Sequence, residues 1–153
     1  QYPDALELRM TRVFAYERAG KSDAAVRELR QLLAERPGDA TVQNALGYTL
    51  ADRNRSLAEA AGLVAAALEQ MPDSPAVLDS MGWVLYRQNR TAEALQYLQR
   101  AAKLGDDVEI VLHLGEVQWA LGDQAAARAA WQSGLERHPD DARLKERLEQ
   151  ARP

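Results

Sequence analysis

The sequence predicts an all-α protein in which antiparallel helix pairs stack one after another into an α-solenoid. Three stretches nearly repeat one another: ALGYTLADRN, SMGWVLYRQN and HLGEVQWALG. Each carries an apolar residue followed by glycine, at Gly47, Gly82 and Gly115, so the glycines lie 35 and 33 residues apart. A unit of this length that recurs in register is typical of repeat architectures, in which each unit buries its apolar face against its neighbours.

Turn signals recur with the same period. They lie 34, 35 and 33 residues apart, at Gly20, Asn54, Asn89 and Gly122. Glycine and asparagine readily adopt the left-handed conformation that follows many helix ends. The sequence therefore predicts four helix-turn-helix repeats and a C-terminal capping helix, at approximately residues 6–39, 40–74, 75–107, 108–141 and 142–151.

The first two repeats depart from the pattern. The first lacks the apolar-glycine pair, and Ser22 or Asp23 is expected to cap its second helix. The second carries one extra residue in its turn. There Ser56 followed by Glu59 predicts a capping box, in which each side chain satisfies a backbone amide at the start of the next helix.

The third repeat is the most regular, and the fourth is followed by the cap. Ser74 and Pro75 form an N-cap and the proline preferred at the first helical position, and Thr91 is expected to cap the second helix. The last stretch, ARLKERLEQ, places Leu144 and Leu148 four residues apart with charge elsewhere. This pattern predicts the solvating terminal helix that a repeat array requires.

We expect residues 1–153 to form a single elongated domain. Pro3 lies where the terminal proline of a preceding repeat would lie, which favours a fragment of a longer array; a chance proline is the alternative. Residues 1–5 are accordingly expected to form an extended tail that packs like the junction between two repeats.

Composition argues against several classes of function. The chain has no cysteine, so a disulfide framework and a thiolate metal site are excluded. Its net charge is −4 and acids alternate with arginines, which argues against a nucleic-acid partner. No run approaches the roughly 20 apolar residues needed to span a bilayer, so we expect no membrane insertion by this segment.

No pattern typical of catalysis appears. His113 and His138 lie in different predicted elements without a nucleophile motif, a phosphate-binding glycine loop or paired carboxylates nearby. We expect His113 on a helix surface or between repeats, and His138 before a turn proline. The sequence therefore predicts no enzyme, no metal and no cofactor.

The repeat resembles a known family. Leu-Gly, a later alanine, an apolar residue and a proline, with a period near 34 residues, resemble the tetratricopeptide pattern W-x2-L-G-x2-Y…A-x3-F…P over almost the whole chain. The resemblance implies a right-handed superhelix whose first helices line a concave face, where protein partners bind. The chaperone-type carboxylate clamp of the family is absent, because its lysine position holds Met10, Asn44, Asp79 and Leu112.

A narrower resemblance concerns the order of the three repeated stretches. It is similar to the C-terminal repeat block of large bacterial tetratricopeptide lipoproteins of the outer membrane. One of these is an adaptor that binds a periplasmic C-terminal-processing protease and brings it substrates. The resemblance implies a scaffold on the periplasmic side of the outer membrane; composition alone leaves periplasm and cytoplasm open.

Large aromatic and charged residues gather on the predicted concave face. At about 100° per residue, they fall on a side of each first helix away from its core positions. The candidate partner-binding residues are Met10, Phe14, Asn44, Tyr48, Asp79, Trp83, Tyr86, Arg87, Glu116 and Trp119. Aromatic anchors beside a few charges are typical of binding hot spots. The alternative is that these rings pack between repeats.

Two functions therefore compete at this stage. The first is a scaffold or adaptor whose concave groove holds a partner segment by aromatic burial, with selectivity from Asp79, Arg87 and Glu116. The second is a self-assembly module through which a longer protein forms homo-oligomers.

Overall fold

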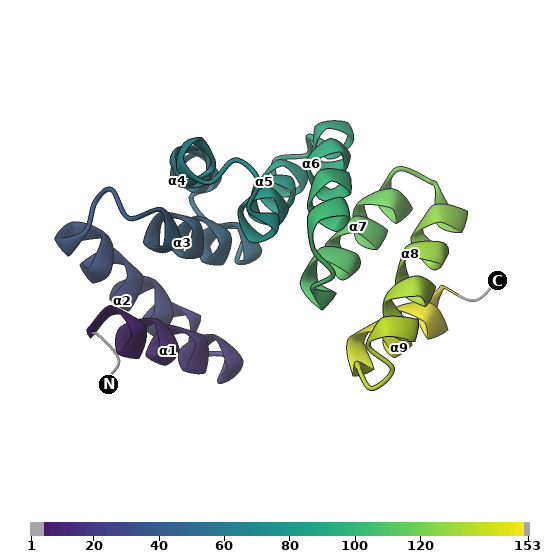
Figure 1. Ribbon diagram of the computed structural model, residues 1–153, viewed down its shortest axis with the longest axis horizontal. Coiled ribbons are helices and arrows are strands. Elements are labelled where there is room, and N and C mark those ends of the chain that lie inside the picture. The colour runs from purple at the N-terminus through teal and green to yellow at the C-terminus, as the bar shows by residue number, and fades with distance from the viewer. Residues whose placement is uncertain (1–4, 152–153) are drawn as a thin grey trace.

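The computed structural model describes residues 5–151, which form nine helices and no strand. In chain order these are α1 (Ala5–Arg18), α2 (Ser22–Glu35), α3 (Ala40–Asp52), α4 (Leu57–Gln70), α5 (Pro75–Arg87), α6 (Thr91–Leu104), α7 (Val108–Ala120), α8 (Gln124–Arg137) and α9 (Ala142–Gln150). The helix pairs follow one another along an arch with the two chain ends at opposite sides (Figure 1). The predicted all-α solenoid is confirmed.

Two further expectations concern the ends and the membrane. The predicted tail at residues 1–5 lies almost wholly outside the described residues, and Ala5 is already the first residue of α1. Among the helices of residues 5–151, none combines the length and the apolar character that crossing a bilayer would require.

The four turn signals all take the left-handed conformation. Gly20, Asn54, Asn89 and Gly122 have φ angles of 69°, 52°, 63° and 86°. In each turn the N–H of the following residue donates to a carbonyl five residues earlier, as Lys21 does to Tyr16 at 2.8 Å. This is the Schellman arrangement, which satisfies carbonyls at the helix end. The period of these signals therefore located the first-helix ends correctly.

Helix starts were predicted less well. Ser74 caps α5 as expected, because its side chain accepts a backbone N–H of the first turn. Ser22 and Thr91, however, are already the first residues of α2 and α6, and Asp23 lies inside α2. The predicted capping box is wrong because Ser56 takes a left-handed conformation, with φ 46°, and makes no side-chain cap bond. The extra residue of that turn leaves a second left-handed residue before α4.

Glycine marks the points where the paired helices touch. A Cβ added at Gly47 would lie 2.6 Å from Val64, one at Gly82 would lie 2.6 Å from Leu98, and one at Gly115 would overlap the Trp131 ring. Glycine weakens a helix interior by roughly 0.5–1 kcal/mol relative to alanine. Glycine at these three positions therefore lowers helix propensity but allows the two helices of a repeat to approach closely.

The buried apolar residues of α7 are divided among three clusters. The largest cluster of buried apolar side chains runs from α1 to α6 and includes Val117 of α7. A second cluster joins α7, α8 and α9. Between them lies a small cluster of Leu78, Ala101 and Ile110. The junction of the third and fourth repeats consequently has less continuous apolar packing than the junctions before it.

We predict that Gly115→Ala lowers the free energy of unfolding by about 1–3 kcal/mol, because the added methyl group displaces the wedged Trp131 ring. Gly62→Ala is the matched control. Gly62 is exposed in the middle of α4 and a Cβ there meets nothing within 4 Å, so this change should raise stability by roughly 0.5–1 kcal/mol. Urea unfolding of both variants measures the difference, and equal effects would contradict the steric account.

Candidate functional site

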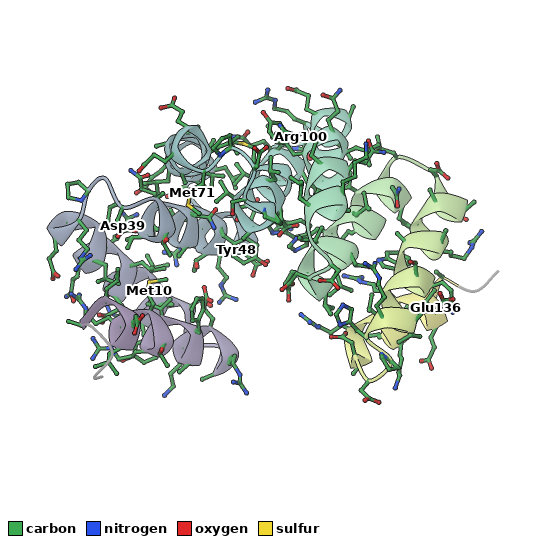
Figure 2. All side chains as sticks on the ribbon, in the orientation of Figure 1. Met10, Asp39, Tyr48, Met71, Arg100 and Glu136 are labelled. Carbon is green, nitrogen blue, oxygen red and sulfur yellow. The ribbon has the colours of Figure 1, made fainter. Side chains whose placement is uncertain are left out.

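The predicted partner-binding residues differ widely in burial. Met10, Asp79 and Trp83 are only 7%, 5% and 5% exposed, whereas Phe14 is 53% exposed. The remaining six are partly buried: Asn44, Tyr48, Tyr86, Arg87, Glu116 and Trp119. Tyr48 lies on the inner side of the arch and Arg100 on its outer side (Figure 2). The candidate residues therefore do not line a single, uniformly exposed groove.

Trp83 is held inside the α5–α7 junction. Its ring stacks on His113 with a centroid separation of 4.0 Å and an interplanar angle of 19°, and lies 5.2 Å from the Tyr86 ring. The prediction that Trp83 is an accessible anchor is wrong, because neighbouring side chains cover it. Trp83 instead packs between two repeats, which was the alternative interpretation. Met10 is likewise buried, within the largest core cluster.

His113 and Asp79 form a buried polar pair across the same junction. Nδ1 of His113 lies 2.9 and 3.0 Å from the two carboxylate oxygens of Asp79, and both residues are 5% exposed. The Tyr48 ring of α3 approaches the imidazole at a centroid separation of 6.0 Å. The expectation that His113 lies on a helix surface or between repeats is met by the second of these places. Asp79 serves this internal contact, so its carboxylate is not presented to a partner.

The junction carries unusual protonation energetics. Burial raises the pKa of Asp79, although the hydrogen bond from His113 opposes this. Burial alone would lower the pKa of His113, but the hydrogen bond and charge of Asp79 outweigh it, with help from Glu109 and Glu116, and raise the pKa above its ordinary value. Nε2 of His113 is 3.8 Å from the Glu109 carboxylate. Carboxylates on both sides therefore favour the protonated imidazole.

Arg87 is also engaged within the protein. Its guanidinium donates to the backbone carbonyls of Ala51 and Asp52 at 3.2 and 3.4 Å, and lies 5.7 Å from the centre of the Trp83 ring. These contacts tie α5 to the end of α3, and the role of Arg87 in partner selectivity stays a prediction.

A pocket of about 230 Å³ opens farther along the chain, between α5, α7, α8 and α9. Its lining residues are Tyr86, Glu116, Trp119, Ala120, Trp131, Arg147, Gln150 and Ala151. Three predicted residues meet there: Tyr86, Glu116 and Trp119. We call this the α5–α9 pocket.

The aromatic walls of the α5–α9 pocket are fixed from behind. Trp131 is 4% exposed, and its indole N–H donates to the Leu112 carbonyl at 3.4 Å. The Trp119 ring lies 6.0 Å from Trp131, centroid to centroid. Tyr86 rests against Trp83 on the opposite side. Because each ring is supported by a buried neighbour, the pocket is preorganised for apolar contact.

One ion pair lies at the rim of this pocket. Arg147 of α9 donates to the Glu116 carboxylate at 3.0 Å, and the two side chains are 42% and 29% exposed. Burial, followed by the negative charge of Glu116, raises the pKa of the Tyr86 phenol. The pocket therefore combines an apolar interior with rim charges that neutralise each other.

Five lining residues were not among the candidate partner-binding residues, namely Ala120, Trp131, Arg147, Gln150 and Ala151. The sequence pattern does not single out Trp131 for binding, and it predicts for the last helix only the solvation of the end of the array. One signal was available: Gln150 occupies in α9 the position that Tyr48 and Trp83 occupy in α3 and α5. Continuing the phase of the concave face into α9 would have found it.

Comparisons with known proteins agree with this architecture. Residues 13–75 and 80–148 match the family model described as tetratricopeptide repeat. A TPR repeat-containing protein of Pseudomonas aeruginosa is 44% identical over 116 residues, which are 76% of this chain and 20% of that protein. The chain thus spans about a fifth of the length of this curated relative.

Solved structures share the fold at low sequence identity. That of pilF from Pseudomonas aeruginosa has a TM-score of 0.75 and 22% identity, covering 95% of this chain and 66% of that one. That of MamA from Desulfovibrio magneticus has a TM-score of 0.68 and 19% identity, covering 88% and 77%. An O-GlcNAc transferase of Thermobaculum terrenum has a TM-score of 0.73 and 19% identity, covering 86% and 26%.

We predict that Trp83→Ala destabilises the protein by about 3–5 kcal/mol, as removal of a buried aromatic side chain does. Trp119→Ala should cost clearly less, because Trp119 is only partly buried. Thermal and urea unfolding followed by circular dichroism compare the two variants. A Trp83→Ala variant as stable as Trp119→Ala would contradict the burial of Trp83.

We also predict a pH dependence from His113. An unfolded histidine titrates near about 6.5, and the pKa of His113 is raised in the folded protein. The protonated pair therefore contributes stability that is fully present below about pH 6.5 and is lost as the pH rises through the raised pKa. The difference in free energy of unfolding between wild type and His113→Gln should therefore become smaller as the pH increases. Urea unfolding from about pH 6 to about pH 9 measures this difference. A difference that stays constant would contradict the assignment.

Proposed function

We propose that this chain, which belongs to the tetratricopeptide repeat family, is an interaction scaffold or adaptor whose concave face binds a segment of a partner protein. The fold of this family mediates protein–protein interactions. Members of this family are typically non-enzymatic, and we assign no catalytic step to the chain. The O-GlcNAc transferase among the similar structures shares the fold alone.

The α5–α9 pocket is the observation that supports this proposal. It brings Tyr86 and Trp119 together over a buried Trp131, beside an ion pair. Tryptophan, tyrosine and arginine are the residues most enriched at interface hot spots, where a few anchors supply most of the binding energy. A preorganised aromatic pocket also reduces the ordering cost of binding. These features favour a partner anchored at the α7–α9 end of the concave face.

The narrower resemblance suggests the kind of partner. The three repeated stretches are similar to the C-terminal repeat block of outer-membrane tetratricopeptide lipoproteins. We extend the proposal accordingly: the chain recruits a periplasmic protease, or the substrates of that protease, on the periplasmic side of the outer membrane.

Self-assembly is the second candidate, and one observation favours it. Leu8 of α1 is 57% exposed, whereas the residues at the same position of α3, α5 and α7 are at most 2% exposed: Val42, Val77 and Ile110. Phe14 on the same helix is 53% exposed. A second copy could cover this face. Light scattering over a concentration series separates the two functions, because the adaptor alone should stay monomeric.

We predict that the double variant Tyr86→Ala/Trp119→Ala keeps its helical content but loses partner capture. Hot-spot residues are worth about 2 kcal/mol or more each, so affinity should fall at least about tenfold. The measurement is a pull-down from bacterial envelope extract with this chain as bait, followed by titration calorimetry on the captured partner.

The matched control is Met71→Ala/Leu104→Ala, which removes two exposed apolar side chains outside the α5–α9 pocket. This control variant should capture the partner protein as well as the wild type does. If the Tyr86/Trp119 variant remains folded and binds every partner at full strength, the binding face lies elsewhere and the proposal fails.

A further inference from the structure

We infer that the α5–α9 pocket receives one uncharged apolar side chain of the partner segment and discriminates against lysine, arginine, aspartate and glutamate side chains. The inference rests on the proposed function and adds the chemistry of the anchor. It follows from the size of the pocket, the polarity of its walls and the charge balance at its rim.

The size of the pocket limits its occupant. Sites for whole small molecules usually measure about 300–1,000 Å³, and this pocket measures about 230 Å³. It also opens on the protein surface between helix ends rather than in an enclosed core. A single side chain projecting from a polypeptide fits these limits better than a free metabolite does.

The interior offers apolar surface and few unsatisfied polar groups. The Tyr86, Trp119 and Trp131 rings form the walls, and the Ala120 methyl group leaves room between them. The one polar atom of Trp131 already donates to the Leu112 carbonyl. A charged group brought against these rings loses part of its water, whereas an apolar group gains from burial.

The rim charges argue against a charged occupant. Glu116 and Arg147 satisfy one another at 3.0 Å and leave no net charge at the mouth of the pocket. A lysine side chain would have to compete with Arg147 for the carboxylate, and a glutamate side chain would have to compete with Glu116 for the guanidinium. A charged occupant would also lose part of its own hydration against the aromatic rings, so the neutral side chain is preferred.

The occupant would also join two parts of the core. Tyr86 packs against the cluster that runs from α1 to α6, and Trp119 and Trp131 belong to the cluster of α7, α8 and α9. A side chain in the pocket contacts both at the junction of the third and fourth repeats. Binding should therefore raise the thermal midpoint progressively as the peptide concentration exceeds the dissociation constant, because the ligand binds the folded state alone.

The test uses peptides of one design, acetylated Gly-Ser-X-Ser-Gly amides in which X is leucine, phenylalanine, lysine or glutamate. Each is titrated into the labelled chain, and the indole N–H signals of Trp83, Trp119 and Trp131 are followed by NMR. The leucine or phenylalanine peptide should shift the Trp119 signal saturably and bind at least about tenfold more tightly than the lysine and glutamate peptides. Binding should change little between about 0.05 and about 0.5 M salt.

Two variant pairs make the test specific. Ala120→Phe fills the pocket and should abolish the shift, whereas Ala129→Phe, on the exposed surface of α8, should not. Arg147→Ala leaves Glu116 unpaired beside the aromatic rings, so the lysine peptide should gain at least about tenfold in affinity through charge and cation–π attraction. The double variant Glu116→Gln/Arg147→Gln should restore the preference for leucine.

The inference is overturned if the lysine or glutamate peptide binds the wild type as tightly as the leucine peptide, or if no peptide shifts the Trp119 signal. Its failure is distinct from failure of the proposed function. Loss of partner capture by Tyr86→Ala/Trp119→Ala without a peptide response would reject the apolar anchor and retain the adaptor. Unchanged capture by that variant would place the binding face elsewhere and reject the proposed function as stated.

Discussion

Close approach of two helices is the constraint from which the rest of this structure follows. At Gly47, Gly82 and Gly115, side chains of the paired helix lie too close to leave room for a Cβ atom. Short helices become stable only when an apolar face is buried, so this contact makes each helix pair a unit. Because each unit still has an open face, the units must stack, and the arch in Figure 1 is the result.

The stacking is not uniform, and the difference lies where the third and fourth repeats meet. Apolar side chains link the earlier repeats continuously, but here a small cluster and the Asp79–His113 pair share the interface. Hydrogen bonding and stacking on Trp83 make the pair compatible with burial. The cost is that one buried imidazole and one buried carboxylate must stay hydrogen-bonded to each other here, a requirement that apolar junctions avoid.

The α5–α9 pocket is a consequence of how α9 ends the array. Arg147 and Gln150 approach α7 from the cap, so Glu116 has an internal partner and Trp119 lines a pocket with them. A cap that merely shielded the core with polar groups would leave a flat surface. This one contributes residues to an aromatic pocket.

The sequence by itself determined the helices, their order and their pairing. Those features depend on local signals that recur at one period: Gly20, Asn54, Asn89 and Gly122 at the turns, and the glycines at the helix contacts. It also placed Tyr86, Glu116 and Trp119 among the candidates for binding. Helix starts were less certain because Ser22 and Thr91 suit a cap and a first turn equally.

Only the tertiary structure decided which of the concave residues are accessible. Phe14 and Trp83 occupy the same position of their repeats, yet one is 53% and the other 5% exposed. His113 of the next repeat stacks on Trp83, whereas the residue at the corresponding position of the second repeat is Ala45, which carries no ring. Burial of this kind is set by contacts between repeats, about 30 residues apart in the chain, and no local pattern encodes it.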